Sequence, residues 1–394
     1  MFLFGRRSRT LVLALGLVLV VLAIPVAGMA GGPPSIAWSP TTSPGTYDYG
    51  ALTLGASASQ TFTLTNSGGS GTGTLKVMLS GSTAFSVTSD NCTAIALGPV
   101  KSCAVTVRYA PPAAGSNTAT LFASAKKPAA SASLTLTGTG APARHVYWAN
   151  DFAGTIGRAS VDGSNPNQSF ITGANNPVGV AVDGNYVYWT DYAAGTIGRA
   201  NLDGTSVNQT FITGASNPRG VAVDGSHIYW TNQFPHTIGR ANLDGSGVDQ
   251  AFITTAGEPY GMTVDGSYVY WTSLYGVNTS DDDTISRASL DGSNVNESFI
   301  TGASAPTGLA VDGTYVYWVN QLTHSIARAN LDGTNPNQSF ITGLIGGVGL
   351  AVDASYIYWG NFGADTVGRA NLDGSGVNQA FITGAVAPAG VAVD

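Results

Sequence analysis

The sequence predicts an all-β protein in which a two-sheet sandwich precedes a six-bladed β-propeller. A Tyr-Trp pair recurs six times in the last 250 residues, mostly 41 residues apart. Short runs of alternating apolar and polar residues fill the region before it. The chain also holds 52 glycines and 18 prolines, with 43% apolar and 10% charged residues, a composition typical of turn-rich globular β structure.

Residues 1–30 are typical of a secretory signal peptide. Arg6, Arg7 and Arg9 precede an apolar run over 11–24, and small residues follow as far as Ala30, where we expect cleavage. The alternative is an uncleaved membrane anchor, but the run is shorter than the roughly 20 residues of a spanning helix. We therefore expect a secreted or envelope-surface protein with no transmembrane segment after cleavage.

The charge distribution excludes nucleic acid as a partner. Residues 31–144 carry six basic and two acidic side chains, whereas 145–394 carry seven arginines and 21 acidic residues. Phosphate binding needs a basic stripe, and the C-terminal region is strongly acidic.

Residues 31–140 predict an immunoglobulin-like sandwich of seven or eight strands. Apolar residues alternate with polar ones, as at Phe62 and Leu64, and turn clusters interrupt the runs about every 10 residues. Cys92 and Cys103 are eleven residues apart, and in an exported chain they predict a disulfide worth about 3 kcal/mol at most. The alternative is a metal pair, for which Asp90 is the one further candidate ligand in that segment.

This region resembles the bacterial choice-of-anchor D domain. The resemblance rests on 62–68 (FTLTNSG), the two cysteines, 107–111 (VRYAP) and 136–140 (LTGTG). It implies an extracellular spacer or adhesion-type module without catalytic residues. A linker over 141–144 separates it from the repeats.

Each repeat after residue 145 contains four strand candidates, as expected for one propeller blade. In the second repeat they are 179–183, 186–190, 196–202 and 209–213, here named strands A to D, with Asp-Gly turns after A and after C. The repeated tryptophans are Trp148, Trp189, Trp230, Trp271, Trp318 and Trp359.

The two ends of the repeat region predict how the ring closes. The first repeat begins at its B strand, 145–149, and the missing A strand follows the last repeat as 390–394. Pairing these ends completes six four-stranded blades and removes an open sheet edge. A solenoid is the structural alternative.

The repeats resemble the YWTD propellers of the low-density lipoprotein receptor class over the whole of 145–394. The motifs are 188–191 (YWTD), 197–204 (IGRANLDG) and 218–224 (PRGVAVD). One repeat spells the full tetrad, and the others replace Asp191 by Asn150, Asn232, Ser273, Asn320 and Asn361. Asparagine and serine can hydrogen-bond but cannot form the family's charged contact at this position.

Two charged positions recur in every blade, which indicates structure and not catalysis. They are expected to form one repeated ionic arrangement. The arginines are Arg158, Arg199, Arg240, Arg287, Arg328 and Arg369, and the aspartates are Asp183, Asp224, Asp265, Asp312, Asp353 and Asp394.

The candidate binding residues lie on the face shared by the B–C and D–A loops. Loops on the opposite face are near copies of one another, whereas these differ between blades and present aromatic residues and an arginine among small ones. The candidates are Phe152, Tyr192, Arg219, Phe234, Tyr260, Tyr275 and Phe362. The alternative is that these loops shield the blade edges and vary freely.

Metal and catalytic sites are weaker hypotheses. His236, Asp283, His324 and Asp365 precede strand C in successive blades, but the ring geometry spaces them too widely for zinc. Asp281, Asp282 and Asp283 form a weak calcium candidate in a six-residue insertion. Known catalytic motifs are absent, so we expect neither an enzyme nor a cofactor.

The sequence therefore predicts a secreted or cell-surface binding or scaffold protein. We expect a monomer that recognises a protein or glycan through the variable loop face. The alternatives are an extracellular propeller lyase or hydrolase with an axial site, and a purely structural envelope component.

Overall fold

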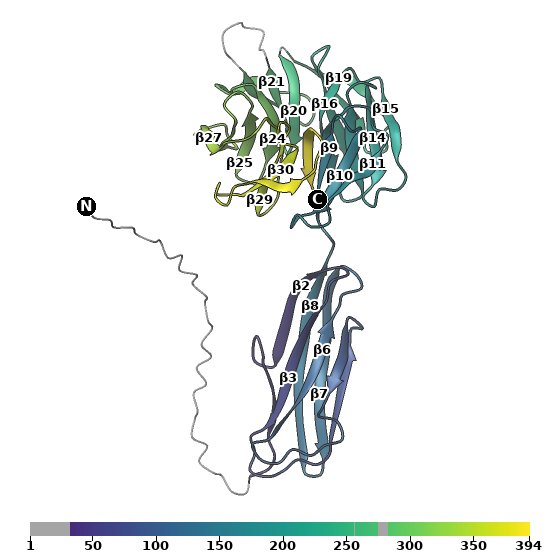
Figure 1. Cartoon of the computed structure of the whole chain (residues 1–394), viewed down its shortest axis with the longest axis vertical. Helices are drawn as coiled ribbons and strands as arrows, with labels where there is room; N and C mark the ends of the chain where they lie inside the picture. Colours follow the sequence, from purple (N-terminus) through teal and green to yellow (C-terminus); the bar gives the residue numbers. More distant parts are fainter. Residues whose placement is uncertain (1–31, 256, 275–282) are drawn as a thin grey trace, which may run out of the picture. The chain divides into compact units, whose positions relative to one another are not determined.

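The computed structural model describes residues 32–255, 257–274 and 283–394. Within them it contains 32 strands and no helix, and the chain divides into two compact units between Pro142 and Ala143 (Figure 1). The predicted signal peptide, Tyr275, Asp281 and Asp282 lie outside the described residues. None of the described segments is a helix capable of crossing a membrane.

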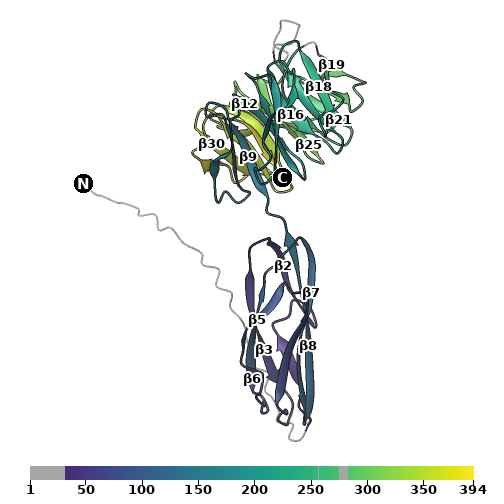
Figure 2. The same cartoon turned by 90° about the vertical axis from the view of Figure 1, so that its right-hand side faces the viewer.

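The N-terminal unit consists of two four-stranded sheets around one core (Figure 2). Trp38 and Phe62 of one sheet pack in the same cluster as Leu121 and Leu134 of the other. The first sheet is β1 (Ile36–Ser39), β3 (Ala58–Asn66), β6 (Ser102–Tyr109) and β5 (Phe85–Asp90) in spatial order; the second is β2 (Thr46–Thr53), β8 (Ala129–Ala141), β7 (Gly115–Lys126) and β4 (Leu75–Gly81).

All pairings in this unit are antiparallel except β2 with β8, which are parallel. The predicted disulfide is confirmed, since Cys92 is bonded to Cys103 with their Cα atoms 5.2 Å apart. It ties the segment after β5 to β6.

The C-terminal unit contains six four-stranded antiparallel sheets, so that the described chain has eight such sheets in all. The first three blades are β32 (Pro388–Val393), β9 (His145–Asn150), β10 (Thr155–Ser160) and β11 (Asn167–Thr172); β12 (Pro177–Val182), β13 (Tyr186–Asp191), β14 (Thr196–Asn201) and β15 (Asn208–Thr213); and β16 (Pro218–Val223), β17 (His227–Asn232), β18 (Thr237–Asn242) and β19 (Asp249–Thr254).

The remaining blades repeat the same order from the axis outward. They are β20 (Glu258–Val264), β21 (Tyr268–Leu274), β22 (Thr284–Ser289) and β23 (Asn296–Ile300); β24 (Pro306–Val311), β25 (Tyr315–Asn320), β26 (Ser325–Asn330) and β27 (Asn337–Thr342); and β28 (Gly347–Val352), β29 (Tyr356–Asn361), β30 (Thr366–Asn371) and β31 (Asn378–Thr383).

The predicted closure of the ring is confirmed. Strand β32 pairs antiparallel with β9, and Val391 lies opposite Trp148 while Val393 lies opposite Val146 (Figure 1). The innermost strands β12, β16, β20, β24, β28 and β32 contact one another in cyclic order. The six sheets are therefore the blades of a closed β-propeller.

Each repeated tryptophan is buried inside its blade. In the second blade the Nε1 of Trp189 donates to Oε1 of Gln209 at 3.1 Å. Gly198 lies opposite Trp189 in the register, and a Cβ there would be 2.1 Å from the indole. Glycine at this point of strand C therefore makes room for the ring.

The repeated arginines do not form the ionic arrangement that the sequence suggested. Nη1 of Arg199 donates to the carbonyl of Leu243 in the next blade at 3.0 Å, and its guanidinium lies 3.8 Å from the centre of the Phe211 ring. All six arginines donate to the next blade in this way.

The repeated aspartates have a different role. Asp183 accepts from the Tyr188 hydroxyl at 2.9 Å and from the amides of the turn that follows. Among the described residues the ion pairs are Arg144–Asp353, His145–Asp394 and His227–Asp224, and none includes a repeated arginine. The prediction of an ionic arrangement is wrong because carbonyls and aromatic faces take the guanidinium groups, while the carboxylates close the A–B turns.

Candidate binding site at the loop face

Close approach of the innermost strands builds a ring of side chains around the axis. A Cβ on Gly179 would lie 2.3 Å from the carbonyl oxygen of Arg219, and one on Gly220 would lie 2.7 Å from that of Tyr260. Glycine at this position lets neighbouring inner strands touch. The residue before each glycine therefore faces the axis, and we call these six residues the mouth: Val178, Arg219, Tyr260, Thr307, Val348 and Ala389.

Threonine hydroxyls fix the backbone of the two largest mouth residues. Oγ1 of Thr190 accepts from the amide of Gly179 and donates to the carbonyl of Arg219, both at 2.7 Å. Thr231 makes the same pair of bonds to Gly220 and Tyr260, both at 2.8 Å. The threonine of the Tyr-Trp-Thr motif thus links one blade to the next, a role that sequence reasoning missed.

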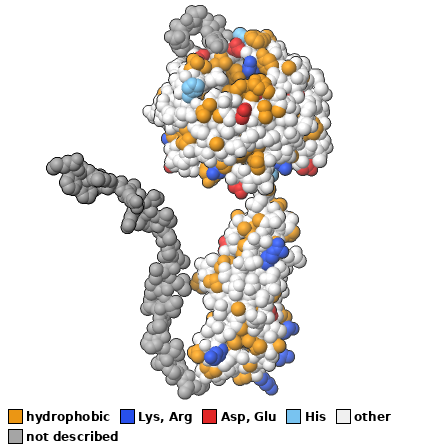
Figure 3. All heavy atoms as spheres, in the orientation of Figure 1, with side chains coloured by type: hydrophobic (Ala, Val, Ile, Leu, Met, Phe, Trp, Pro, Cys, Tyr) orange, Lys and Arg blue, Asp and Glu red, His pale blue; other side chains and the backbone are white. Residues whose placement is uncertain are grey.

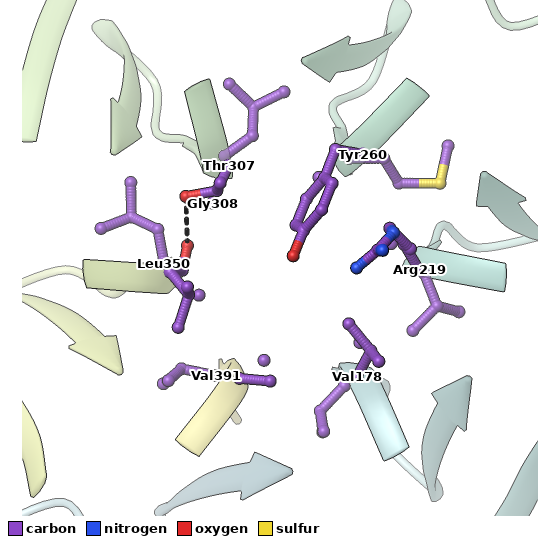
Figure 4. A pocket seen from close by; sticks show the side chains of 18 residues that line it. Val178, Arg219, Tyr260, Thr307, Gly308, Leu350 and Val391 are labelled. Atoms are coloured by element: carbon purple, nitrogen blue, oxygen red, sulfur yellow. Dashed lines mark hydrogen bonds between the residues drawn. The ribbon is translucent and has the colours of Figure 1, made fainter. Parts of the chain in front are cut away.

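The mouth opens into a small axial cavity. The space that can hold the centre of a water-sized molecule is ≈ 60 Å³. Figure 4 shows Arg219 and the Tyr260 hydroxyl pointing into it from one side, with Val178 beside Arg219 and with Leu350 and Val391 across the cavity. One wall is therefore polar and the opposite wall is aliphatic.

Arg219 is the centre of the polar side. Its guanidinium lies 4.7 Å from the ring centre of Tyr192 and 4.4 Å from that of Tyr260. Nε donates to Oε1 of Gln233 at 2.7 Å, and the amide of Gln233 donates to Glu258. These contacts bring together residues from the second, third and fourth blades.

Burial sets the electrostatics around this cluster. It raises the pKa of Tyr260, and the nearby Arg219 cation opposes this only in part. Burial also raises the pKa of Asp151, again against the effect of Arg219. Oδ1 of Asp151 is buried and has no hydrogen-bond partner in the described part of the chain.

Exposed apolar side chains stand in the B–C and D–A loops, on the same face as the mouth. Phe152 and Leu322 are 74% and 73% exposed, and Ile345 is 50% exposed. The rings of Phe152 and Phe362 meet edge to face with centres 5.4 Å apart. In the space-filling view, hydrophobic side chains gather on one face of the propeller with a basic side chain among them (Figure 3). Solvent-exposed aromatic groups of this kind are typical of recognition surfaces.

The structure groups the predicted binding residues into separate clusters. Tyr192, Arg219 and Tyr260 lie together, and Phe152 lies with Phe362. Phe234 is 50% exposed and its ring centre lies 6.1 Å from that of His236.

Sequence reasoning missed Asp151, Gln233 and Glu258. The first two stand three residues after the buried tryptophan, and that position varies from blade to blade: Asp151, Tyr192, Gln233, Leu274, Gln321 and Phe362. Variation at one register position of an otherwise uniform repeat was the signal that could have found them.

The residues that precede strand C serve as turn residues. His236, His324 and Asp365 adopt left-handed backbone angles, with φ of 64°, 51° and 56°. Asp283 and Asp365 each accept a backbone amide of the following D–A loop, at 2.7 and 2.9 Å. Across the described ranges, no three His, Cys, Asp or Glu side chains are grouped to hold a metal ion.

Asp191, the acidic residue of the YWTD tetrad, caps a loop. It is 1% exposed, and its Oδ1 accepts from the amide of Asn175 at 3.0 Å. Asn232 accepts from Ser216 in the same way at 2.9 Å. Burial raises the pKa of Asp191 to about 6, since the hydrogen bonds it receives offset only part of the lost hydration.

Comparisons with known proteins agree with this geometry. Residues 185–224 match the family model of the low-density lipoprotein receptor repeat class B. The structure titled "Crystal structure of Nidogen/Laminin Complex" is 23% identical with a TM-score of 0.56, over 64% of this chain and 98% of that one. The C-terminal unit is therefore a β-propeller, and its second repeat matches the class B repeat model.

Two lyase structures also match, with lower scores. Virginiamycin B lyase from Staphylococcus aureus is 18% identical with a TM-score of 0.43, over 59% of this chain and 79% of that one. A streptogramin B lyase is 17% identical with a TM-score of 0.44, over 59% and 78%. The comparison with curated protein sequences found no match.

Proposed function

We propose that this is a secreted, monomeric binding protein that recognises a partner protein through the mouth and the loops around it. The supporting observation is that the propeller repeats its internal contacts in blade after blade but differs between blades at the mouth. A solved propeller of the same fold comes from a protein complex, the nidogen–laminin structure. The proposal favours a protein over a glycan because the mouth and the loops around it combine an oriented cation, aromatic faces and exposed aliphatic groups.

The N-terminal unit fits the role of a spacer. We propose that it is an immunoglobulin-like domain of the choice-of-anchor D type, that residues 1–30 direct export, and that the disulfide forms after export. The proposed function has no catalytic step. The repeated arginines hold neighbouring blades together, and the repeated aspartates close the A–B turns within their blades.

Site-specific photocrosslinking tests this proposal. A benzophenone amino acid replaces Phe234 in the full-length protein, and a control variant carries it at Val207, which is 43% exposed on the opposite face. Each variant is irradiated with the envelope and secreted fractions of the source organism.

We expect a discrete protein adduct from position 234 that excess unmodified protein suppresses, and none from position 207. Equal adducts from both positions, or no adduct from 234, would refute recognition at the mouth. An adduct whose added mass is removed by a glycosidase, with no peptide of a second protein in its mass spectrum, would overturn the choice of a protein partner.

A further inference from the structure

The guanidinium of Arg219 is held in a fixed orientation. Its Cζ lies 4.7 Å from the ring centre of Tyr192 and 4.4 Å from that of Tyr260, and Nε donates to Oε1 of Gln233 at 2.7 Å. Gln233 is itself buried and bonded to Glu258. A side chain held by two aromatic rings and by a hydrogen bond along one edge needs little further ordering to bind a ligand.

The other edge of this guanidinium faces the cavity. Among the described residues, Arg219 donates to Gln233 at 2.7 Å and forms no ion pair, and the Tyr260 hydroxyl lies near its guanidinium. By contrast, Arg199 and the other repeated arginines use Nη1 to bind a carbonyl. Figure 4 shows the terminal nitrogens of Arg219 directed into the cavity beside the Tyr260 hydroxyl.

This edge matches a carboxylate. Two parallel N–H groups of a guanidinium bind the two oxygens of a carboxylate, and the Tyr260 hydroxyl can donate a third bond. Leu350 and Val391 lie across the cavity from Arg219, and Val178 and Val348 also line it. With ≈ 60 Å³ for the centres of water-sized molecules, the cavity has room for a small aliphatic group beside the carboxylate.

Two acidic side chains near the site bear on the choice of ligand. Glu258 is engaged by the amide of Gln233. Asp151 forms no ion pair with Arg219 among the described residues. Asp151 therefore weakens an anion site without filling it.

We propose that the mouth is a carboxylate site that takes an acid group on a short aliphatic body. The same chemistry is offered by the C-terminal carboxylate of a partner polypeptide and by a free small monocarboxylate. The first source rests on the proposed function, because it places the end of a partner chain in the mouth.

The test is a titration of the full-length protein followed by NMR of its ¹⁵N-labelled arginine side chains. The probes are N-acetylvaline, its neutral amide N-acetylvalinamide, and isovalerate. The Nε signal of Arg219 is identified by its loss in Arg219→Lys. We expect a saturable shift with N-acetylvaline and none with the amide, because only the acid can accept from the cation. Equal binding of acid and amide would overturn the proposal.

Three variants test which side chains determine the affinity for the carboxylate. Arg219→Gln should weaken N-acetylvaline binding at least about tenfold. Arg219→Lys should weaken it less, since lysine keeps the positive charge but lacks the two parallel N–H groups of the guanidinium. Asp151→Asn should tighten it, because a neighbouring negative charge is removed. Unchanged affinity in Arg219→Gln, with an unchanged thermal midpoint, would also overturn the site.

The probes distinguish the two sources and separate this proposal from the proposed function. Tighter binding of N-acetylvaline than of isovalerate assigns the site to a polypeptide terminus, and the reverse order assigns it to a free monocarboxylate. A crosslink at position 234 without any carboxylate binding would refute the carboxylate site alone. Carboxylate binding without a crosslink would refute the protein partner alone.

Discussion

Replacing Asp191 by asparagine should stabilise the propeller, and more so at neutral than at acidic pH. Asp191 is 1% exposed, and burial raises its pKa from 3.8 to about 6. Between these values the unfolded chain has released the proton while the folded chain still holds it, so that stability falls as the pH rises. Above about pH 6 the accumulated loss is about 3 kcal/mol.

Asparagine at position 191 cannot ionise, so that it removes this loss of stability, and its side-chain amide adds a hydrogen-bond donor. In the third blade, Nδ2 of Asn232 donates to the Gln250 carbonyl at 2.9 Å, and the new side-chain amide in Asp191→Asn would face the equivalent Gln209 carbonyl. We expect the free energy of unfolding in urea to rise by about 1 to 3 kcal/mol near pH 7.5, and by about 2 kcal/mol less near pH 4.5. Tryptophan fluorescence reports the transition, since each blade buries a tryptophan.

The matched control is Asp249→Asn. Asp249 is exposed and also stands where other blades carry asparagine, as at Asn208. That change should alter stability by less than about 0.5 kcal/mol. A loss of stability in Asp191→Asn, or a gain of equal size at both pH values, would refute the reasoning about burial.

Two further changes test the packing of each unit. Gly179→Ala should destabilise the propeller by about 1 to 3 kcal/mol in urea unfolding, because its Cβ would lie 2.3 Å from the Arg219 carbonyl. The control is Gly184→Ala, whose Cβ would have nothing within 4 Å. Equal effects of the two changes would contradict the close approach of the inner strands at the mouth. Replacing Cys92 and Cys103 by serine should lower the free energy of unfolding of the N-terminal unit by about 3 kcal/mol in calorimetry. The unfolding transition of the propeller should stay unchanged, because the disulfide lies in the other unit. A shift of the propeller transition instead would contradict the division into two units.

The closed ring could be predicted because it follows from the order of elements along the chain. The first repeat begins at its B strand and the missing A strand comes last, and an unpaired strand edge at each end is unfavourable. The structure pairs β32 with β9 as this order requires. The spacing of the tryptophans and the positions of the turn residues predict four strands in every blade.

The contacts of the charged residues could not be predicted from the repeat alone. A residue that recurs at one position in every blade, such as Arg199, indicates that its contact also recurs. The repeat does not indicate which atom accepts the hydrogen bond from the guanidinium. In the fold Nη1 of Arg199 donates to the Leu243 carbonyl of the next blade, 44 residues away in sequence. The role of Gln233 could not be predicted for a similar reason. Its partner Arg219 lies 14 residues earlier, and the two side chains come together because strands A and B of the third blade pair.

The most direct test of recognition at the mouth is the affinity for the crosslinked partner of two alanine variants. One replaces Tyr192, Phe234 and Tyr260; the other replaces exposed Val207, Val248 and Val377, which lie in C–D turns on the opposite face. We predict that the first variant weakens binding at least about 100-fold and the second by less than about twofold. Unchanged affinity in the first variant, with its thermal midpoint preserved, would contradict the claim that the mouth is where this propeller binds.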